Sequence, residues 1–303
     1  MTINRRKFLS GGAALAAASA LPNTKAAAAL RVNQLTGFNI GGAAAGPKNL
    51  LQILEGLGHT PDACWDVAAI DCYDGSAQDV FDLTANNVDL WRGTSDAATT
   101  DDPTFVGTAG DLLSSTYFTL DGGDFFRCKS QPAFIQKWHK ATATVTCIIL
   151  GYWDDLGIQA GCGTQARDIG NHGMFIDCHW NATGITNMGV TISDTASLYN
   201  QGSTAEWTEN TIQLLGISID EASAGTASKH YIDGTTEGYD GSYSAPAGTD
   251  ATYTLEICAA GNAVAPYKAG SRFYACAFLP TTLDGAGFDA IRAELVTQGR
   301  IGA

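Results

Sequence analysis

The stretch Arg272-Phe-Tyr-Ala-Cys-Ala-Phe-Leu279 decides the fold class of this chain. After the single arginine every residue is apolar or aromatic, so both faces of an extended chain would be buried here. A short run that is apolar on both faces is expected of a strand inside a sandwich of two sheets. The stretch therefore predicts a buried strand near the end of an all-β domain.

Other strand-like runs, separated by turns rich in Gly, Asp, Asn and Thr, lie upstream of this stretch. In the segment 251–258, Tyr253, Leu255 and Ile257 alternate with polar residues, which predicts a half-buried strand. Further strands are expected at 116–120, 142–150, 189–193 and 211–219. We therefore predict an all-β fold, a two-sheet antiparallel β-sandwich of the jelly-roll kind.

Two short helices are expected at the ends of this strand-rich region. The segment 47–57 has an apolar face, begins at a proline and ends among glycines, which is the usual asymmetry of helix ends. The segment 284–298 also has an apolar face, and Asp284 is a good N-cap residue. The helices are therefore expected to flank the sandwich in sequence.

The composition supports many turns and argues against nucleic acid as a partner. The chain has 303 residues, with 17 Lys and Arg against 31 Asp and Glu, and a formal net charge of −14. The acidic residues are 24 Asp and only 7 Glu, and Asp favours turns whereas Glu favours helices. Binding to phosphate backbones needs clustered Lys and Arg, which this chain lacks.

The N-terminus resembles a bacterial export signal. The pair Arg5-Arg6, followed by Phe8-Leu9, is similar to the twin-arginine (Tat) motif, and small residues at 26–29 offer cleavage sites. The apolar stretch behind the pair is too short to span a membrane. A disordered basic leader is the alternative. We expect a leader at 1–29, an N-terminal segment with a short helix at 30–63, and a sandwich domain at 64–303.

Eight cysteines leave the redox state of the chain open. They would permit up to four disulfides in an exported protein, and their connectivity cannot be read from sequence. Cys147 and Cys276, however, lie within strand-like apolar runs, where a cysteine commonly serves as a small buried apolar side chain. Both interpretations are kept.

Four segments, in their order along the chain, resemble motifs of the concanavalin A-like lectin/glucanase superfamily, specifically its LamG-like branch. Val80-Phe-Asp-Leu-Thr-Ala-Asn-Asn87 resembles the turn W-x-D-L-S-G-N, with Phe in place of Trp. Phe118-Thr-Leu-Asp-Gly-Gly-Asp-Phe-Phe126 resembles F-D-G-x-D-D-Y. The segment 215–220 with His230-Tyr-Ile-Asp-Gly234 resembles paired strands ending in Y-V-D/N-G, and 267–283 resembles the final strand.

This resemblance covers about residues 64–297 and implies a jelly roll that often binds glycans, sometimes binds calcium and sometimes cleaves polysaccharides. Glucanases of the superfamily carry an E-x-D-x-x-E run, which places carboxylates on one face of a strand. That run is absent, and the nearest acidic pairs are Asp220-Glu221 and Glu206 with Glu209. We therefore assign no catalytic residue.

Sugar recognition in a β-sandwich usually combines an exposed aromatic ring with hydrogen-bonding side chains. Trp153 and Trp180 are the best placed aromatic residues, because each is followed directly by polar residues. The predicted carbohydrate-binding residues are Trp153, Asp154, Trp180, Asn181, Tyr199 and Trp207. Trp65 and Trp138 lie beside apolar strand residues and are expected in the core.

Calcium is the expected cofactor if there is one, because hard carboxylate and carbonyl oxygens suit this ion. The predicted metal ligands, all in loops rich in Asp, are Asp121, Asp124, Asp154 and Asp155. Solvated Asp in turns is the alternative.

Three interpretations of the function follow. The first is a non-catalytic module, secreted or exposed on a cell surface, that recognises a carbohydrate or polysaccharide. The second is a structural protein of a virion (phage head or tail, or host attachment) or of a surface assembly, in contact with other subunits. The third is a polysaccharide hydrolase or lyase. The first implies export to the periplasm, the cell surface or the medium.

Overall fold

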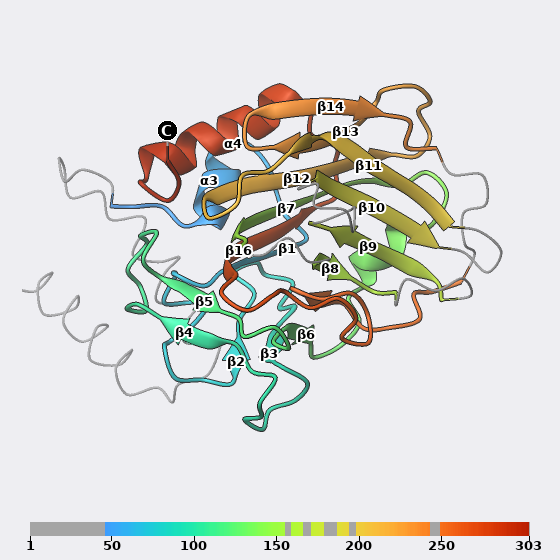
Figure 1. The fold of residues 1–303 in the computed structure, drawn as a ribbon. Helices are drawn as coiled ribbons and strands as arrows, with labels where there is room; N and C mark the ends of the chain where they lie inside the picture. Colours follow the sequence, from blue (N-terminus) through green and yellow to red (C-terminus); the bar gives the residue numbers. More distant parts are fainter. Residues whose placement is uncertain are drawn as a thin grey trace, which may run out of the picture. The chain divides into compact units, whose positions relative to one another are not determined.

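The computed structural model describes residues 46–154, 159–165, 171–178, 187–193, 198–242 and 249–302. Within these residues the chain from Pro47 onward forms one compact unit. It contains two antiparallel sheets of eight strands each, two α-helices and one short 3₁₀ helix (Figure 1). The prediction of an all-β, two-sheet antiparallel sandwich with short helices is confirmed.

Each sheet has short strands toward one edge, and the long strands lie in the middle of sheet A and toward the opposite edge of sheet B. Sheet A runs in the order β14 (Thr235–Tyr239), β13 (Ser228–Ile232), β12 (Ile212–Asp220), β7 (Thr144–Tyr152), β16 (Arg272–Leu279), β5 (Tyr117–Thr119) and β4 (Thr104–Val106), with β1 (Ala63–Asp66) also paired to β16. Sheet B runs in the order β11 (Leu198–Glu206), β10 (Asn187–Ser193), β9 (Gly173–Asp177), β8 (Ala160–Gly163), β15 (Glu256–Ile257), β6 (Phe126–Cys128), β3 (Leu90–Arg92) and β2 (Asp79–Val80). The 3₁₀ helix is η1 (Ala133–Lys137).

The stretch quoted first is strand β16, with the predicted bounds, and it lies between β7 and β5 in sheet A. The C-terminal helix α4 (Gly285–Thr297) is capped by Asp284, whose carboxylate accepts a hydrogen bond from the Gly287 N–H at 2.8 Å. The helix α3 (Leu50–Gly56) lies within the predicted segment 47–57.

The predicted strand at 251–258 is wrong for most of its length, because only Glu256–Ile257 pair as strand β15. The reason lies in Gln131. Its side-chain amide donates to the Tyr253 carbonyl at 2.8 Å and accepts from the Leu255 N–H at 2.9 Å. A side chain therefore satisfies backbone groups that a neighbouring strand would otherwise bind.

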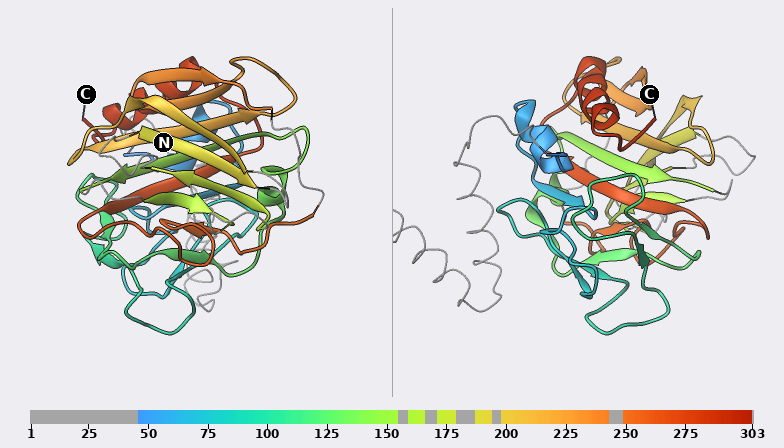
Figure 2. Two further views of the ribbon diagram at one scale, coloured as in Figure 1. Left: turned by 45° about the vertical axis from the view of Figure 1, so that its right-hand side comes forward. Right: turned by 90° about the vertical axis from the view of Figure 1, so that its left-hand side faces the viewer.

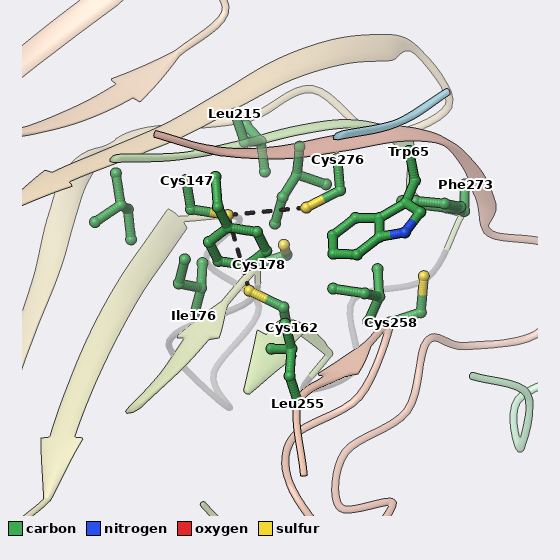
Figure 3. Close-up of a cluster of buried hydrophobic side chains, with 14 of the residues drawn as sticks. Trp65, Cys147, Cys162, Ile176, Cys178, Leu215, Leu255, Cys258, Phe273 and Cys276 are labelled. Carbon is green, nitrogen blue, oxygen red and sulfur yellow. Dashed lines mark hydrogen bonds between the residues drawn. The ribbon is translucent and has the colours of Figure 1, made fainter. Parts of the chain in front are cut away.

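The space between the sheets is filled by the inward-facing residues of both. Strand β7 directs Val145, Cys147 and Ile149 into this core, as the alternation of a strand requires. The sulfur of Cys147 lies 3.8 Å from that of Cys162 on sheet B and 4.0 Å from that of Cys276 (Figure 3). All eight cysteines are free and buried. The interpretation of the cysteines as small buried side chains is confirmed, and no disulfide is present.

The opposite face of sheet A forms a second apolar layer with the two helices (Figure 2). Ile148 and Leu150 of β7 pack here with Leu54 of α3 and Phe288 of α4. A Cβ atom at Gly216 of β12 would collide with the Phe288 ring, so a glycine is required for this close approach. None of the described helices is long and apolar enough to span a membrane.

A buried ion pair fixes this second layer to strand β1. The guanidinium of Arg300 donates to both carboxylate oxygens of Asp66, at 2.9 and 2.8 Å, and both side chains are 0% exposed. Asp66 also accepts from the Leu50 N–H at 2.8 Å at the start of α3. The pair is bidentate and further hydrogen-bonded, which is the arrangement that a buried charge requires.

Candidate functional site

Two of the predicted carbohydrate-binding aromatic residues belong to the core. Trp153 is 0% exposed and Trp207 is 2% exposed. Their ring centroids are 5.5 Å apart, and Trp153 also contacts Tyr267 at 5.9 Å. The prediction that they form an exposed platform is therefore corrected. Trp65 and Trp138, which were expected in the core, are also buried there.

Other predicted residues cannot be placed. Trp180, Asn181 and Asp155 lie outside the described residues, and so does the side chain of Tyr199, whose backbone belongs to β11. Their roles stay predictions. Asp154 is described and exposed.

The alternation of β7 explains why Trp153 is buried and identifies its neighbour as the surface residue. Ile148 and Leu150 face the helices, and Tyr152 follows them on the same face. Gly151 lies against the Trp153 ring, which turns back into the sandwich after the strand ends. The surface aromatic residue is therefore Tyr152, one position before the predicted tryptophan.

Strand pairing brings two further side chains to Tyr152. Arg272 at the start of β16 lies opposite both Tyr152 of β7 and Thr119 of β5. Tyr117 lies two residues from Thr119 and so on the same face of β5. Tyr117, Tyr152 and Arg272 are each only partly buried. Together with Tyr274 and Asn210, which contact them, they are called the tyrosine–arginine cluster below.

The guanidinium of Arg272 lies between two aromatic rings. Its central carbon is 4.2 Å from the ring centroid of Tyr152 and 4.7 Å from that of Tyr117. These distances are within the range of cation–π contacts. The Tyr152 hydroxyl donates to the Asn210 side-chain oxygen at 2.9 Å. Both rings and the guanidinium are thus held in defined positions by three neighbouring strands.

Tyr274 packs against the partly exposed side chains of the cluster. Its ring is buried, and its centroid is 5.4 Å from that of Tyr117. Burial raises the pKa of Tyr274 to about 12, although the nearby Arg272 charge lowers it. Burial by itself would lower the pKa of Arg272, but the Tyr274 hydroxyl and the neighbouring tyrosines raise it on balance. Arg272 therefore stays charged and Tyr274 stays neutral at physiological pH.

Arg272 differs from the other arginines of the described chain in its partners. Arg127 pairs with Glu256, Arg292 with Asp233 and Arg300 with Asp66. Arg92 donates to backbone carbonyls and to the Tyr73 hydroxyl. Within the described ranges Arg272 forms no ion pair. Its central carbon lies over the rings of Tyr117 and Tyr152 instead.

Three of the four predicted metal ligands lie around the loop that leads into β16. Gly270, at φ +90°, has no room for a Cβ because the Asp154 carboxylate lies against it. Gly122, next to Asp121, lies beside Ala269 of the same loop. The sequence-predicted Asp121, Asp124 and Asp154 are therefore near one loop. In the described ranges, no three His, Cys, Asp or Glu side chains are grouped as metal ligands.

Asp124 is the unusual member of this set. One carboxylate oxygen accepts from the Asp121 N–H at 2.9 Å, whereas the other is buried without a partner. Burial, with the negative charge of Asp121 beside it, raises the pKa of Asp124 to about 7. A cation would relieve such a group. Because Asp155 lies outside the described residues, calcium at this loop stays a prediction.

The outer face of sheet B offers a contrasting polar group. Glu256 is 1% exposed and accepts from Arg127 at 2.6 Å and from the Ala263 N–H at 2.7 Å. Trp91 lies opposite Arg127 in the register of β3 and β6, and it is partly exposed. The charges of Arg127 and Glu256 compensate each other, so neither requires a ligand.

Comparisons with known proteins show the fold and not the family. No family model matches the chain, and no curated protein matches its sequence. Domain 4 of AbnA, a GH43 extracellular arabinanase from Geobacillus stearothermophilus solved with arabinotriose, is 12% identical, with 77% of this chain and 98% of that chain covered and a TM-score of 0.53.

Two further solved structures are similar at lower identity or coverage. The botulinum neurotoxin serotype D binding domain is 9% identical over 80% of this chain and 53% of its own, with a TM-score of 0.51. The CBM40 of the Ruminococcus gnavus IT-sialidase is 13% identical over 59% of this chain and 96% of its own, with a TM-score of 0.45. At such identities the likeness to the arabinanase domain and the toxin domain shows a shared β-sandwich.

Proposed function

We propose that this chain is a non-catalytic carbohydrate-binding module and that the tyrosine–arginine cluster contacts the glycan. The observation that carries the proposal is the placement of Tyr117 and Tyr152, partly exposed, on either side of Arg272. The shared fold with a domain solved in complex with arabinotriose supports it. Export to the periplasm, the cell surface or the medium is part of the proposal and agrees with the leader predicted at 1–29 from Arg5-Arg6.

The chemistry of the cluster suits a sugar. A tyrosine ring offers an apolar surface for the C–H groups of a pyranose, and hydroxyl, amide and guanidinium groups nearby bind its hydroxyls. The Tyr152 hydroxyl is already bonded to Asn210, and the rings are fixed by Arg272. Because these side chains lose little freedom on binding, more of the contact energy appears as affinity.

Glycan binding by single-ring variants tests the proposal. We expect Tyr152→Ala and Tyr117→Ala each to weaken binding roughly tenfold, about 1.4 kcal/mol, in titration calorimetry with a glycan found by array screening. Trp91→Ala is the matched control, because Trp91 is a partly exposed aromatic residue on the outer face of sheet B. Wild-type affinity in both tyrosine variants, or loss in the control, would place the site elsewhere.

A further inference from the structure

We infer that the ligand of the tyrosine–arginine cluster carries a carboxylate, as in a uronic acid or another acidic sugar, and that Arg272 binds it. The inference rests on the proposed function and narrows its ligand class. Its basis is that a partly buried guanidinium, flanked by two rings, has no carboxylate partner in the described chain.

Three of the four other arginines in the described residues contact carboxylates, whereas Arg92 contacts backbone carbonyls and the Tyr73 hydroxyl. Arg292, on helix α4, has an exposed fraction of 24% and binds Asp233 at 2.9 and 3.3 Å. Arg127 and Arg300 likewise donate to carboxylates. A carboxylate from a ligand would give Arg272 the partner that these residues find within the chain.

The guanidinium of Arg272 is also chemically suited to such a ligand. Its central carbon lies over the rings of Tyr117 and Tyr152, and a guanidinium that forms no ion pair can bind a carboxylate in a bidentate manner through its in-plane N–H groups. Lysine presents a point charge and lacks this planar geometry. The charge and planar geometry of Arg272 therefore favour a planar acid over a neutral hydroxyl group.

The charge of the whole chain makes this recognition local. With a net charge of −14, the protein repels polyanions at long range, and Asp154 adds an exposed carboxylate beside Gly270. An acidic glycan would therefore bind through one specific contact and not through a general positive surface. Loss of Arg272 should then remove most of the preference for the acid.

The test compares acidic oligosaccharides with their methyl esters, which keep the sugar and remove the charge. We expect the full chain, in titration calorimetry with a panel of uronic-acid oligosaccharides, to bind at least one acid tenfold or more tightly than its ester. Arg272→Gln should make the two affinities equal, and Arg272→Lys should retain part of the preference. Arg292→Gln removes the same charge from an already paired arginine and should leave the preference unchanged.

The outcomes separate the two proposals. Equal binding of acid and ester by the wild type, or an unchanged preference in a folded Arg272→Gln variant, overturns the acidic ligand and leaves the glycan module standing. No binding of neutral or acidic glycans overturns both. If polyglutamate binds through Arg272 as tightly as the uronates, the ligand is an anion other than a sugar, which also overturns the inference. Melting temperatures of both Arg272 variants check that they fold.

Discussion

The two faces of sheet A are built by the same strands and are closed in different ways. The inner face of β7 meets sheet B, and Cys147 lies among sulfur atoms from both sheets (Figure 3). The outer face of the same strand is covered by α3 and α4 around Ile148 and Leu150. It ends at Tyr152, where the cluster is partly open to solvent.

Because of this difference, we expect the inner face to contribute most of the stability and the open end of the outer face, at Tyr152, to bind the ligand. Apolar burial is worth about 25 cal/mol per Å² wherever it occurs, so a sealed inner face gives the fold its main support. The outer face is covered only by the helices α3 and α4, and the polar side chains of the tyrosine–arginine cluster lie at the end of this face. The inner face should therefore tolerate polar substitutions poorly, and the uncovered end of the outer face should tolerate them well.

The largest expected effect is loss of the ion pair that holds the outer layer. Arg300→Met would leave the Asp66 carboxylate buried without its cation, which typically costs about 3–5 kcal/mol. Urea unfolding measures the change. Lys48→Gln is the control, because Lys48 pairs with Glu294 at the surface, and such pairs contribute about 0–1 kcal/mol. Similar losses in both variants would mean that Asp66 tolerates the missing partner.

The second effect is pH dependence from a buried histidine at the inner face. Burial lowers the pKa of His230 from 6.5 to about 4, although Glu237 and the Gln201 carbonyl act in the opposite direction. The unfolded chain therefore takes up a proton between these values that the native chain does not. Stability from this group is complete above pH 6.5 and is lost as the pH falls toward 4, by about 3 kcal/mol.

Unfolding free energies measured from pH 7 to pH 4 check this prediction. His230→Phe keeps a ring against Tyr239, whose centroid lies 4.2 Å from that of His230. It should show a shallower fall with acidification than the wild type, because only the carboxylates and His139, whose pKa is also lowered by burial, then contribute. Parallel curves would show that His230 takes up its proton in the native state.

The third effect concerns the thiols. Cys147→Ser would bury a hydroxyl group among sulfur and carbon atoms, at a cost of about 1–3 kcal/mol. Cys147→Val keeps an apolar side chain of similar size and should cost less. Denaturant unfolding ranks the two variants. If serine is better tolerated than valine, the space around Cys147 is limited by size and not by polarity.

Sequence patterns were sufficient where local chemistry decides the structure. The apolar run Arg272–Leu279 and the Asp284 cap needed no distant partner to be recognised. The short pairing of β15 could not be foreseen, because Gln131 binds the backbone at Tyr253 and Leu255 from more than a hundred residues away. Distant side chains that replace strand partners leave no local pattern.

The sequence pattern predicts Trp153 as the surface aromatic residue, whereas the structure places its neighbour Tyr152 at the surface. Trp153 has the composition of a sugar platform, since polar residues follow it, but the alternation of Thr144–Tyr152 directs Tyr152 to the surface. That alternation was available in the sequence. The meeting of Tyr117, Tyr152 and Arg272 was not, because it depends on which strands pair across the sheet.

The smallest effect separates the structural and binding parts of the cluster. Tyr152→Phe keeps the ring against Arg272 and removes the hydrogen bond to Asn210, whose net value is about 0.5–1.5 kcal/mol. We expect a slightly lower melting temperature, with the preference for an acidic glycan retained, because that preference depends on Arg272. Tyr117→Phe is the matched control, since no hydrogen bond of its hydroxyl occurs among the described residues. If Tyr152→Phe abolishes the preference and Tyr117→Phe does not, the Tyr152 hydroxyl and Asn210 bind the acid directly, and the uncovered end of the outer face recognises its ligand through hydrogen bonds more than through charge.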